Sequence, residues 1–327
     1  MDSNKNQLEE IMDEFLSQAL SLRLDRNSPE EKAAFQERMS KARELALGGL
    51  SPRAAGELRV QKILNWVYAF EKSTIPVLEK VGGSNQYGKV QKLIERGFLR
   101  VQNSKAGGFD GVSKKIVTLT VAGLDYVERH TDQMYRYRWA KDPSGLNQNH
   151  LLHDLIAQIL TISNLQQGRI EGFEPESRSG AKNQIGKKKP DVIWLMPEEK
   201  RWGLEVELTK KTGRDAHTFV SRVVDSLITK NLGDRLDAFL LVTDKPGIEK
   251  AYKAAMSVGS PIIEYRKDSR NRWVEIEGNR RVPESIEGRF MTICKSDFFA
   301  LLRPKSSKGG VNENIDNLFC DTCYNWM

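Results

Sequence analysis

The chain has 327 residues, enough for about two domains, and its 39 % apolar content is sufficient for hydrophobic cores. Its three cysteines cannot supply a disulfide framework for a chain of this length. The acidic start does not resemble a signal peptide, and no apolar run approaches the roughly 18 residues that cross a bilayer. We therefore expect a soluble, cytoplasmic protein without membrane insertion.

The net charge of +7 is unevenly distributed along the chain. Residues 1–50 carry 7 basic and 10 acidic side chains, whereas residues 51–130 carry 13 basic and 7 acidic ones. A local excess of positive charge suits a domain that binds phosphates, although solubility alone would also explain it.

Residues 1–50 are expected to form an N-terminal helical hairpin. Apolar residues recur at helical spacing over 6–22, and a second helix opens at Ser28-Pro29 and ends near Gly48-Gly49. The hairpin would pack on the next domain or on a partner chain.

Residues 51–130 show the order of a winged helix-turn-helix domain. The expected elements are helices at 57–71, from Ser73 and at 85–96, strands at 97–101 and 116–120, and a closing helix at 121–130. The loop over 103–115 is basic and rich in glycine, as a DNA-binding wing would be. The sequence therefore predicts binding to double-stranded DNA, with a winged helix that mediates only protein contacts as the alternative.

The side chains expected to touch DNA lie on the third helix, in the wing and in a later polar loop. Asn and Gln can read adenine edges, and lysines mostly contact phosphates. The candidates are Asn85, Gln86, Lys89, Gln91, Lys92, Lys105, Lys114, Lys115, Lys187, Lys188 and Lys189.

Residues 131–148 are predicted to be a linker rich in basic and aromatic groups, which either docks the domains or contacts nucleic acid. Tyr135 and Tyr137 within it are conceivable nucleophiles. Residues 149–303 alternate helices and strands and predict an α/β domain with a mixed central sheet. Residues 304–327 are expected to form a flexible tail.

Acidic residues on two neighbouring strands are the candidate catalytic centre. Asp191 begins one strand, and Glu205 and Glu207 lie two apart on the next, so they share one face. A tight turn near 197–200 would place Asp191 opposite Glu205 or Glu207. Three converging carboxylates repel one another unless a cation lies between them, and oxygen ligands suit Mg²⁺ or Mn²⁺.

Structural roles compete with this interpretation. Glu207 could pair with Lys210 or Lys211, and acids at strand ends are common. His150 and His153, three apart on one helix, could bind a metal but fit a capping or core role better.

The order of these motifs resembles a known family. The stretch "KPDVIWLMPEEKRWGLEVEL", preceded by "NHLLHDL" and by a winged helix, is similar to the replication-relaxation family and to MobC-type plasmid mobilisation relaxases. The resemblance covers about residues 57–245. It implies a restriction-endonuclease-like αβββαβ domain of the PD-(D/E)xK type that nicks DNA at a plasmid transfer or replication origin. It also makes other mobilisation or transposition proteins candidate partners of the N-terminal hairpin.

The resemblance assigns the acidic positions to Asp191, Glu205 and Glu207, and that of the first helix to Asp154. Position 207 departs from the wider nuclease motif, which has lysine there; either Lys211 or Lys189 would replace it, or the acids would bind the metal in a different way. Two other functions stay open at this point. One is a non-catalytic DNA-binding regulator or replication accessory factor with a degenerate nuclease domain, and the other is a transposase-partner endonuclease.

Overall fold

The computed structural model describes residues 49–83, 88–104, 114–131, 134, 137–146, 148, 150–176, 188–276 and 280–298, with isolated residues between 33 and 41. Most of the predicted N-terminal hairpin and the whole 304–327 tail therefore lie outside the described residues. The same holds for Asn85, Gln86, Lys105 and Lys187. The chain divides into two compact units, Met1–Leu58 and Arg59–Met327, and the description below concerns the second.

The first part of this unit contains helices and one strand hairpin. Its elements are the larger part of α3 (Pro52–Phe70), which begins in the first unit, and then α4 (Ile75–Val81), α5 (Lys89–Glu95), β1 (Leu99–Asn103), β2 (Lys115–Leu119) and α6 (Val121–Glu128). β1 and β2 pair antiparallel, with Leu99 opposite Leu119. The Thr120 hydroxyl caps α6 by accepting the Gly123 amide at 3.1 Å. Helices and strands therefore occur in the order that the sequence predicts, with bounds that shift by a few residues.

A buried carboxylate fixes the start of α5. Glu79 of α4 is 4 % exposed, and its Oε1 accepts the amides of Gly88 at 2.9 Å and Val90 at 3.0 Å. These amides belong to the first turn of a helix, where no helical carbonyl can reach them. Glu79 thus orients α5 relative to α4.

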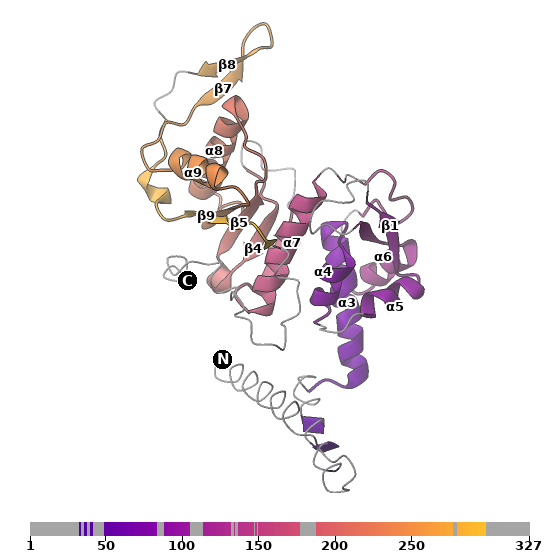
Figure 1. Ribbon diagram of the computed structural model, residues 1–327. Coiled ribbons are helices and arrows are strands. Elements are labelled where there is room, and N and C mark those ends of the chain that lie inside the picture. Colours follow the sequence, from indigo (N-terminus) through magenta and orange to yellow (C-terminus); the bar gives the residue numbers. More distant parts are fainter. Residues whose placement is uncertain are drawn as a thin grey trace. The chain divides into compact units, whose positions relative to one another are not determined.

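The second part contains one mixed five-stranded sheet in the order β3-β4-β5-β6-β9. Its strands are β3 (Gly172–Pro175), β4 (Val192–Leu195), β5 (Arg201–Val206), β6 (Ala238–Thr243) and β9 (Phe290–Cys294). β3, β4 and β5 pair antiparallel, while β6 runs parallel to both of its neighbours. The protein is therefore a mixed α/β protein (Figure 1).

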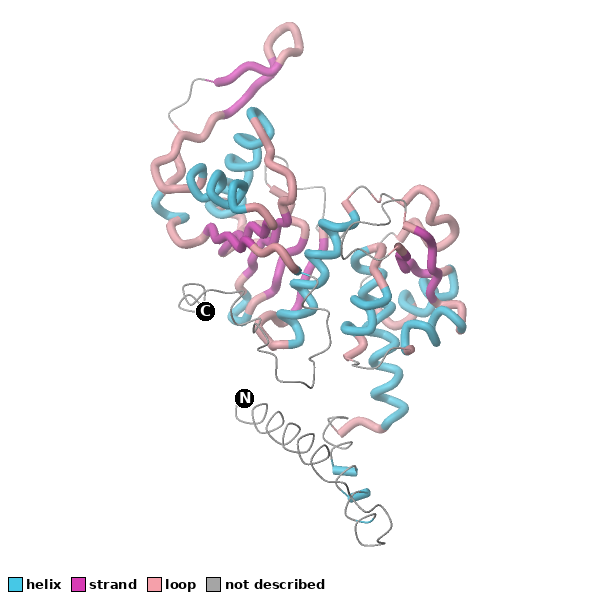
Figure 2. Tube along the Cα trace, viewed as in Figure 1, coloured by secondary structure: helices cyan, strands magenta, loops and turns pink. Residues whose placement is uncertain are grey.

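Helices cover both faces of this sheet (Figure 2). α7 (Leu151–Gln166) packs with Trp194 and Leu204, whereas α8 (Gly213–Ile228) and α9 (Pro246–Ala255) pack with Ile193 and Phe239. Side chains alternate between the faces of a strand. Odd-numbered residues of β4 and β5 therefore point toward α8 and α9, and even-numbered residues point toward α7.

Polar contacts join the first part of the unit to α7. Gln158 is completely buried; its Oε1 accepts Trp66 Nε1 at 2.9 Å and the Ser73 hydroxyl at 2.7 Å. Its Nε2 donates to the Lys72 carbonyl at 3.0 Å. Because all these partners are buried, losing one would leave an unsatisfied polar group, and this penalty keeps the two parts in register.

A second strand hairpin lies outside the central sheet. β7 (Glu264–Lys267) pairs antiparallel with β8 (Trp273–Ile276), and η2 (Glu284–Ile286) precedes β9. Among the described residues, β7 pairs only with β8. Within the same residues, no helix is long and apolar enough to span a bilayer.

Candidate active site

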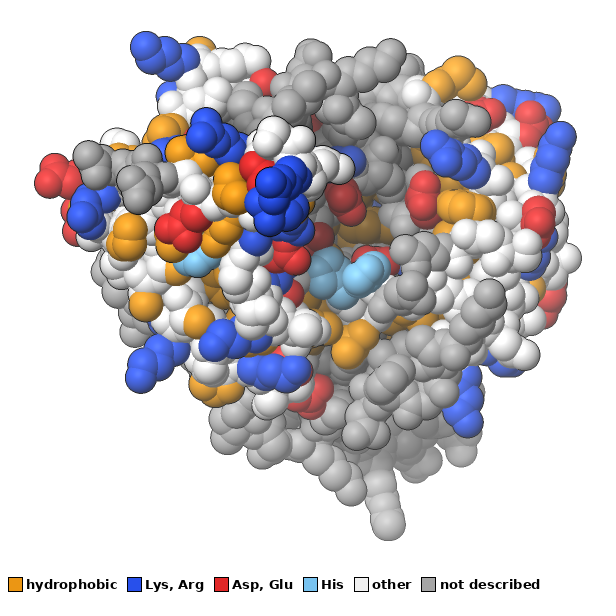
Figure 3. All heavy atoms as spheres, turned by 90° about the horizontal axis from the view of Figure 1, so that it is seen from above, with side chains coloured by type: hydrophobic (Ala, Val, Ile, Leu, Met, Phe, Trp, Pro, Cys, Tyr) orange, Lys and Arg blue, Asp and Glu red, His pale blue; other side chains and the backbone are white. Residues whose placement is uncertain are grey.

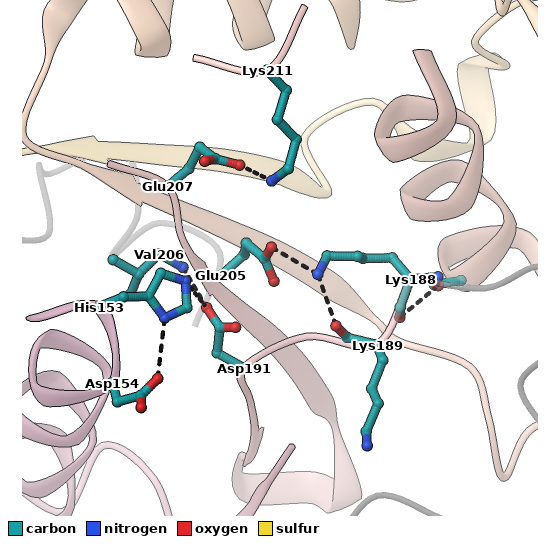
Figure 4. A network of polar contacts seen from close by, with 10 residues as sticks. His153, Asp154, Lys188, Lys189, Asp191, Glu205, Val206, Glu207 and Lys211 are labelled. Carbon is teal, nitrogen blue, oxygen red and sulfur yellow. Dashed lines mark hydrogen bonds and ion pairs between the residues drawn. The ribbon is translucent and has the colours of Figure 1, made fainter. Parts of the chain in front are cut away.

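Asp191 and Glu205 meet at the end of the β4–β5 pair. Val192 lies opposite Leu204 in the antiparallel register, so the preceding position of β4 is opposite Glu205. Asp191 Oδ2 accepts the Val206 amide at 2.7 Å, which ties the carboxylate to the neighbouring strand (Figure 4). The pairing of Asp191 with Glu205 expected from the tight turn is therefore present.

His153 of α7 holds Asp191 from the other side. Its Nε2 lies 3.1 Å from Asp191 Oδ2, and its Nδ1 lies 3.4 Å from Asp154 Oδ1. Burial alone would lower the pKa of His153, but the two carboxylates outweigh it and raise this pKa to about 10. At neutral pH His153 is therefore a cation between two carboxylates, which does not suit a metal ligand.

Asp154 is one step removed from Asp191. Its Oδ2 pairs with Lys72 Nζ at 2.5 Å, and that lysine is 7 % exposed. Burial opposes ionisation of Asp154, but His153 and Lys72 outweigh burial and lower its pKa. Asp154 thus orients His153 instead of joining Asp191 and Glu205.

Glu205 is 3 % exposed and lies between opposing influences. Burial and the charge of Asp191 raise its pKa to about 7, against the effect of Lys188. Its Oε1 pairs with Lys188 Nζ at 2.7 Å, while its Oε2 is buried and accepts no hydrogen bond from the described residues. An unsatisfied buried carboxylate oxygen beside a second carboxylate is an arrangement that a bound cation would relieve.

Helix α8 positions the lysines around Glu205. The Lys188 amide donates to Ser226 Oγ at 3.1 Å and to the Arg222 carbonyl at 3.2 Å, so its backbone is fastened to α8. The ring of Phe219 lies 5.9 Å from Lys188 Nζ and 5.0 Å from Lys211 Nζ. Lys188, which was expected to grip DNA, therefore pairs with Glu205, while the Lys189 side chain points away from it (Figure 4).

Glu207 pairs with a different lysine from the one that pairs with Glu205. It follows the last residue of β5 and is 6 % exposed, and its carboxylate pairs with Lys211. Burial lowers the pKa of Lys211, while the charges of Glu205 and Asp191 act in the opposite direction. Lys211 therefore lies within electrostatic reach of both carboxylates, although position 207 itself holds an acid.

The three-carboxylate metal centre expected from the sequence is not assembled. Among the described residues, no three His, Cys, Asp or Glu side chains are placed to hold a metal ion together. Glu207 is turned toward Lys211, whereas Asp191 and Glu205 stay adjacent. Strand alternation does not determine the direction of Glu207, because β5 ends one residue earlier.

Part of this cluster can be reached from solvent. Carboxylate and histidine side chains are seen in a hollow, with Lys and Arg side chains beside it (Figure 3). Asp191 and His153 side chains are 14 % and 22 % exposed, so both can be reached from solvent. The site is thus partly open while Glu205 stays buried behind it.

Candidate DNA contacts within the described residues lie on α5 and at the start of β2. Gln91 and Lys92 are exposed on α5, and Lys114 and Lys115 are exposed where β2 begins. Lys89 is half-buried; burial and the charge of Arg59 lower its pKa, and Glu79 opposes them. Gln91 donates to Glu95 at 3.2 Å within the same helix.

Of the two linker tyrosines, Tyr137 lies among the described residues. Tyr135 lies outside the described residues. The hydroxyl of Tyr137 is buried, donates to the Glu71 carbonyl at 2.9 Å and accepts the Leu119 amide at 3.0 Å. Burial raises its pKa well above the usual range. Tyr137 therefore packs against the first part of the unit and is not placed to attack a phosphate.

Sequence reasoning did not assign His153 and Lys72 to the site. His153 stands directly before Asp154, but the sequence does not reveal that its Nε2 reaches the start of β4. Lys72 is more than eighty residues away from Asp154 in the chain, and no local pattern connects them.

Comparison of the chain with protein-family models, curated proteins and solved structures finds no match.

Proposed function

We propose that this protein binds duplex DNA and cleaves one strand with the help of Mg²⁺ or Mn²⁺. The observation that carries the proposal is the pair of Asp191 and Glu205, set opposite each other where β4 begins beside β5, with one buried Glu205 oxygen that has no hydrogen-bond partner among the described residues. Cleavage at a plasmid transfer or replication origin, as in MobC-type relaxases, is part of the proposal and rests on the sequence resemblance.

The order of elements supports the two halves of this function. Helices α3, α4 and α5 followed by the β1–β2 hairpin have the order of a winged helix, with α5 as the helix that enters the major groove. The order α7, β3, β4, β5, α8, β6 is that of a restriction-endonuclease-like domain.

The donor set fits a hard divalent cation. Glu205 Oε2 is available, and the contacts of Asp191 described here use Oδ2, which leaves Oδ1 as the second ligand. Phosphate oxygens and water would complete the shell, as is usual for Mg²⁺. When bound, such an ion would activate water and stabilise the charge that develops on the phosphate.

The protein's own groups would orient the reaction. His153 and the Val206 amide hold Asp191 in one orientation, so that its other oxygen faces the position next to Glu205. Lys211, in the loop after β5, lies within electrostatic reach of Glu205 and Asp191 and would take the place of the lysine that position 207 lacks. Its ammonium would neutralise a phosphate oxygen, once Glu207 no longer holds it.

One observation favours a second function, that of a non-catalytic DNA-binding factor. Each of the three acids already has a cationic partner: Asp191 has His153, Glu205 has Lys188, and Glu207 has Lys211. A cluster neutralised in this way is stable without any metal.

A cleavage assay separates the two functions. Supercoiled plasmid carrying the origin of the element that encodes this protein should be converted to open circles by the full chain with 5–10 mM Mg²⁺ or Mn²⁺, on the order of the millimolar levels at which weakly held ions saturate. Addition of a chelator should stop the reaction. Binding of the same DNA without cleavage under any of these conditions would support the non-catalytic factor instead.

A further inference from the structure

The β7–β8 hairpin carries cationic side chains that the proposed reaction does not use. Arg266, Lys267 and Arg270 are exposed on residues 264–276, which we call the basic arm. The arm is outside the central sheet and adjoins α8 (Figure 1). Because this hairpin contributes no residue to the hydrophobic core clusters, its side chains can contact a partner.

Two of the three acids of the arm are engaged by other arginines. Asp268 pairs with Arg272 at 2.8 Å and shapes the turn, and Glu264 pairs with Arg280 at 2.7 Å, while the third acid, Glu275, is exposed on β8. In the described part of the chain, no ion pair involves Arg266, Lys267 or Arg270. Three cations thus remain available on one short hairpin.

Two cationic side chains lie beside the ring of Trp273 on the arm. Its side chain is 51 % exposed, with the Arg214 guanidinium 4.8 Å and the Lys267 ammonium 5.5 Å from the ring centroid. Two cations near one ring repel each other, and attraction to its π face offsets this repulsion. Arg214 also lies 3.3 Å from exposed Asp215, a weak contact that a stronger anion would replace.

The root of the arm is fixed. Arg280 links Glu264 of β7 to Asp225 and Ser221 of α8, and the ring of Tyr265 lies 6.2 Å from that of His217. These contacts come from two turns of the same helix. The arm therefore holds its cations in place, so that little order is lost when a partner binds.

A short segment, residues 211–214, links the candidate active site to the arm. Lys211 reaches Glu207, and Arg214, three residues later in the same segment, reaches Trp273. We propose that the basic arm binds the phosphate backbone of the DNA that leaves the site, as a second contact beside the one made by α5. This inference rests on the proposed function, because it takes the partner of the site to be DNA.

The chemistry of the arm favours a phosphate backbone. Arginine is the side chain best suited to phosphate, through its planar fork of donors. A row of separate cations without an apolar pocket matches a regularly spaced anion, whereas a protein partner would need buried apolar area as well.

Binding of a 30-base-pair duplex (about three helical turns, a usual site length) to the full chain in chelator tests the arm without any cleavage. We expect Arg266→Gln with Arg270→Gln to weaken binding about ten- to thirtyfold at 0.15 M salt, and to reduce the slope of log affinity against log salt by about 1.8. The matched control is Lys200→Gln with Lys230→Gln, which removes the same charge from one exposed position before β5 and another after α8. This control should bind the duplex nearly as tightly as the parent does.

Trp273→Ala provides a test that keeps every charge. It should weaken binding about threefold, because the two cations lose the ring that holds them; melting curves establish that each variant is folded. If both arm variants bind the duplex as tightly as the parent does, the arm does not contact DNA, even if the parent cleaves DNA. If the arm variants bind the duplex more weakly and the parent never cleaves DNA, the result would support DNA binding by the arm and contradict the proposed cleavage activity. Tighter binding of duplex RNA than of DNA would overturn DNA as the partner.

Discussion

Replacing Asp191 with asparagine is expected to lower the rate of plasmid nicking by on the order of 10³-fold, because the proposed divalent ion and the water that it would activate would supply several kcal/mol of stabilisation. Asparagine keeps an oxygen that can accept the Val206 amide, so the β4–β5 contact should survive. What it removes is the negative charge that faces Glu205. The rate of conversion of supercoiled to open-circular plasmid at saturating Mn²⁺ measures the effect.

The same variant should bind DNA within about threefold of the parent, since α5 and the β1–β2 hairpin are unchanged. Glu198→Gln is the matched control, because it removes one carboxylate charge from the turn at the other end of the same strand pair. Nicking by Asp191→Asn at the rate of this control would exclude Asp191 from the reaction.

Replacing His153 with glutamine is expected to destabilise the metal-free protein by on the order of 3 kcal/mol at pH 6, which corresponds to a fall in melting temperature of roughly 8 °C. His153 is the cation between Asp154 and Asp191, and glutamine leaves the two partly buried carboxylates facing a neutral group. Thermal melts in the presence of a chelator measure the loss.

The effect of this change should depend on pH in a defined direction. The pKa of His153 is raised from 6.5 to about 10 in the folded protein, so its contribution is present in full below about pH 6.5 and is lost as the pH rises toward 10. The difference in stability between parent and His153→Gln should shrink over this interval. His150→Gln, an exposed neighbour on the same helix, should show no such trend. A difference that stays constant from pH 6 to pH 10 would contradict the ion pairs assigned to His153.

The pairing of Asp191 with Glu205 could be predicted because it depends on local geometry. A short turn fixes the register of two strands, and the alternation of side chains then decides which positions share a face. The structure has this pairing, with Val192 opposite Leu204. The direction of Glu207 could not be derived in this way, because alternation ends with the strand at Val206.

The partners of these acids could not be predicted because they come from distant elements. Lys188 reaches Glu205 only because its backbone is bonded to α8, and His153 reaches Asp191 only because α7 packs on the sheet. The basic run at 187–189 indicated a DNA contact by composition alone. The structure shows that neighbouring lysines can have different roles: Lys188 pairs with Glu205, and Lys189 points elsewhere.

We propose that Asp191 and Glu205 together hold one divalent ion, and the rest of the proposed reaction depends on this ion. Calorimetric titration of the full chain with Mn²⁺ tests it without any DNA and without any assumption about the reaction. We predict one bound Mn²⁺ per chain for the parent, and an affinity lowered at least tenfold by Glu205→Gln, which removes one of two charged ligands. Equal Mn²⁺ binding by parent and variant, or no binding by the parent, would contradict the claim.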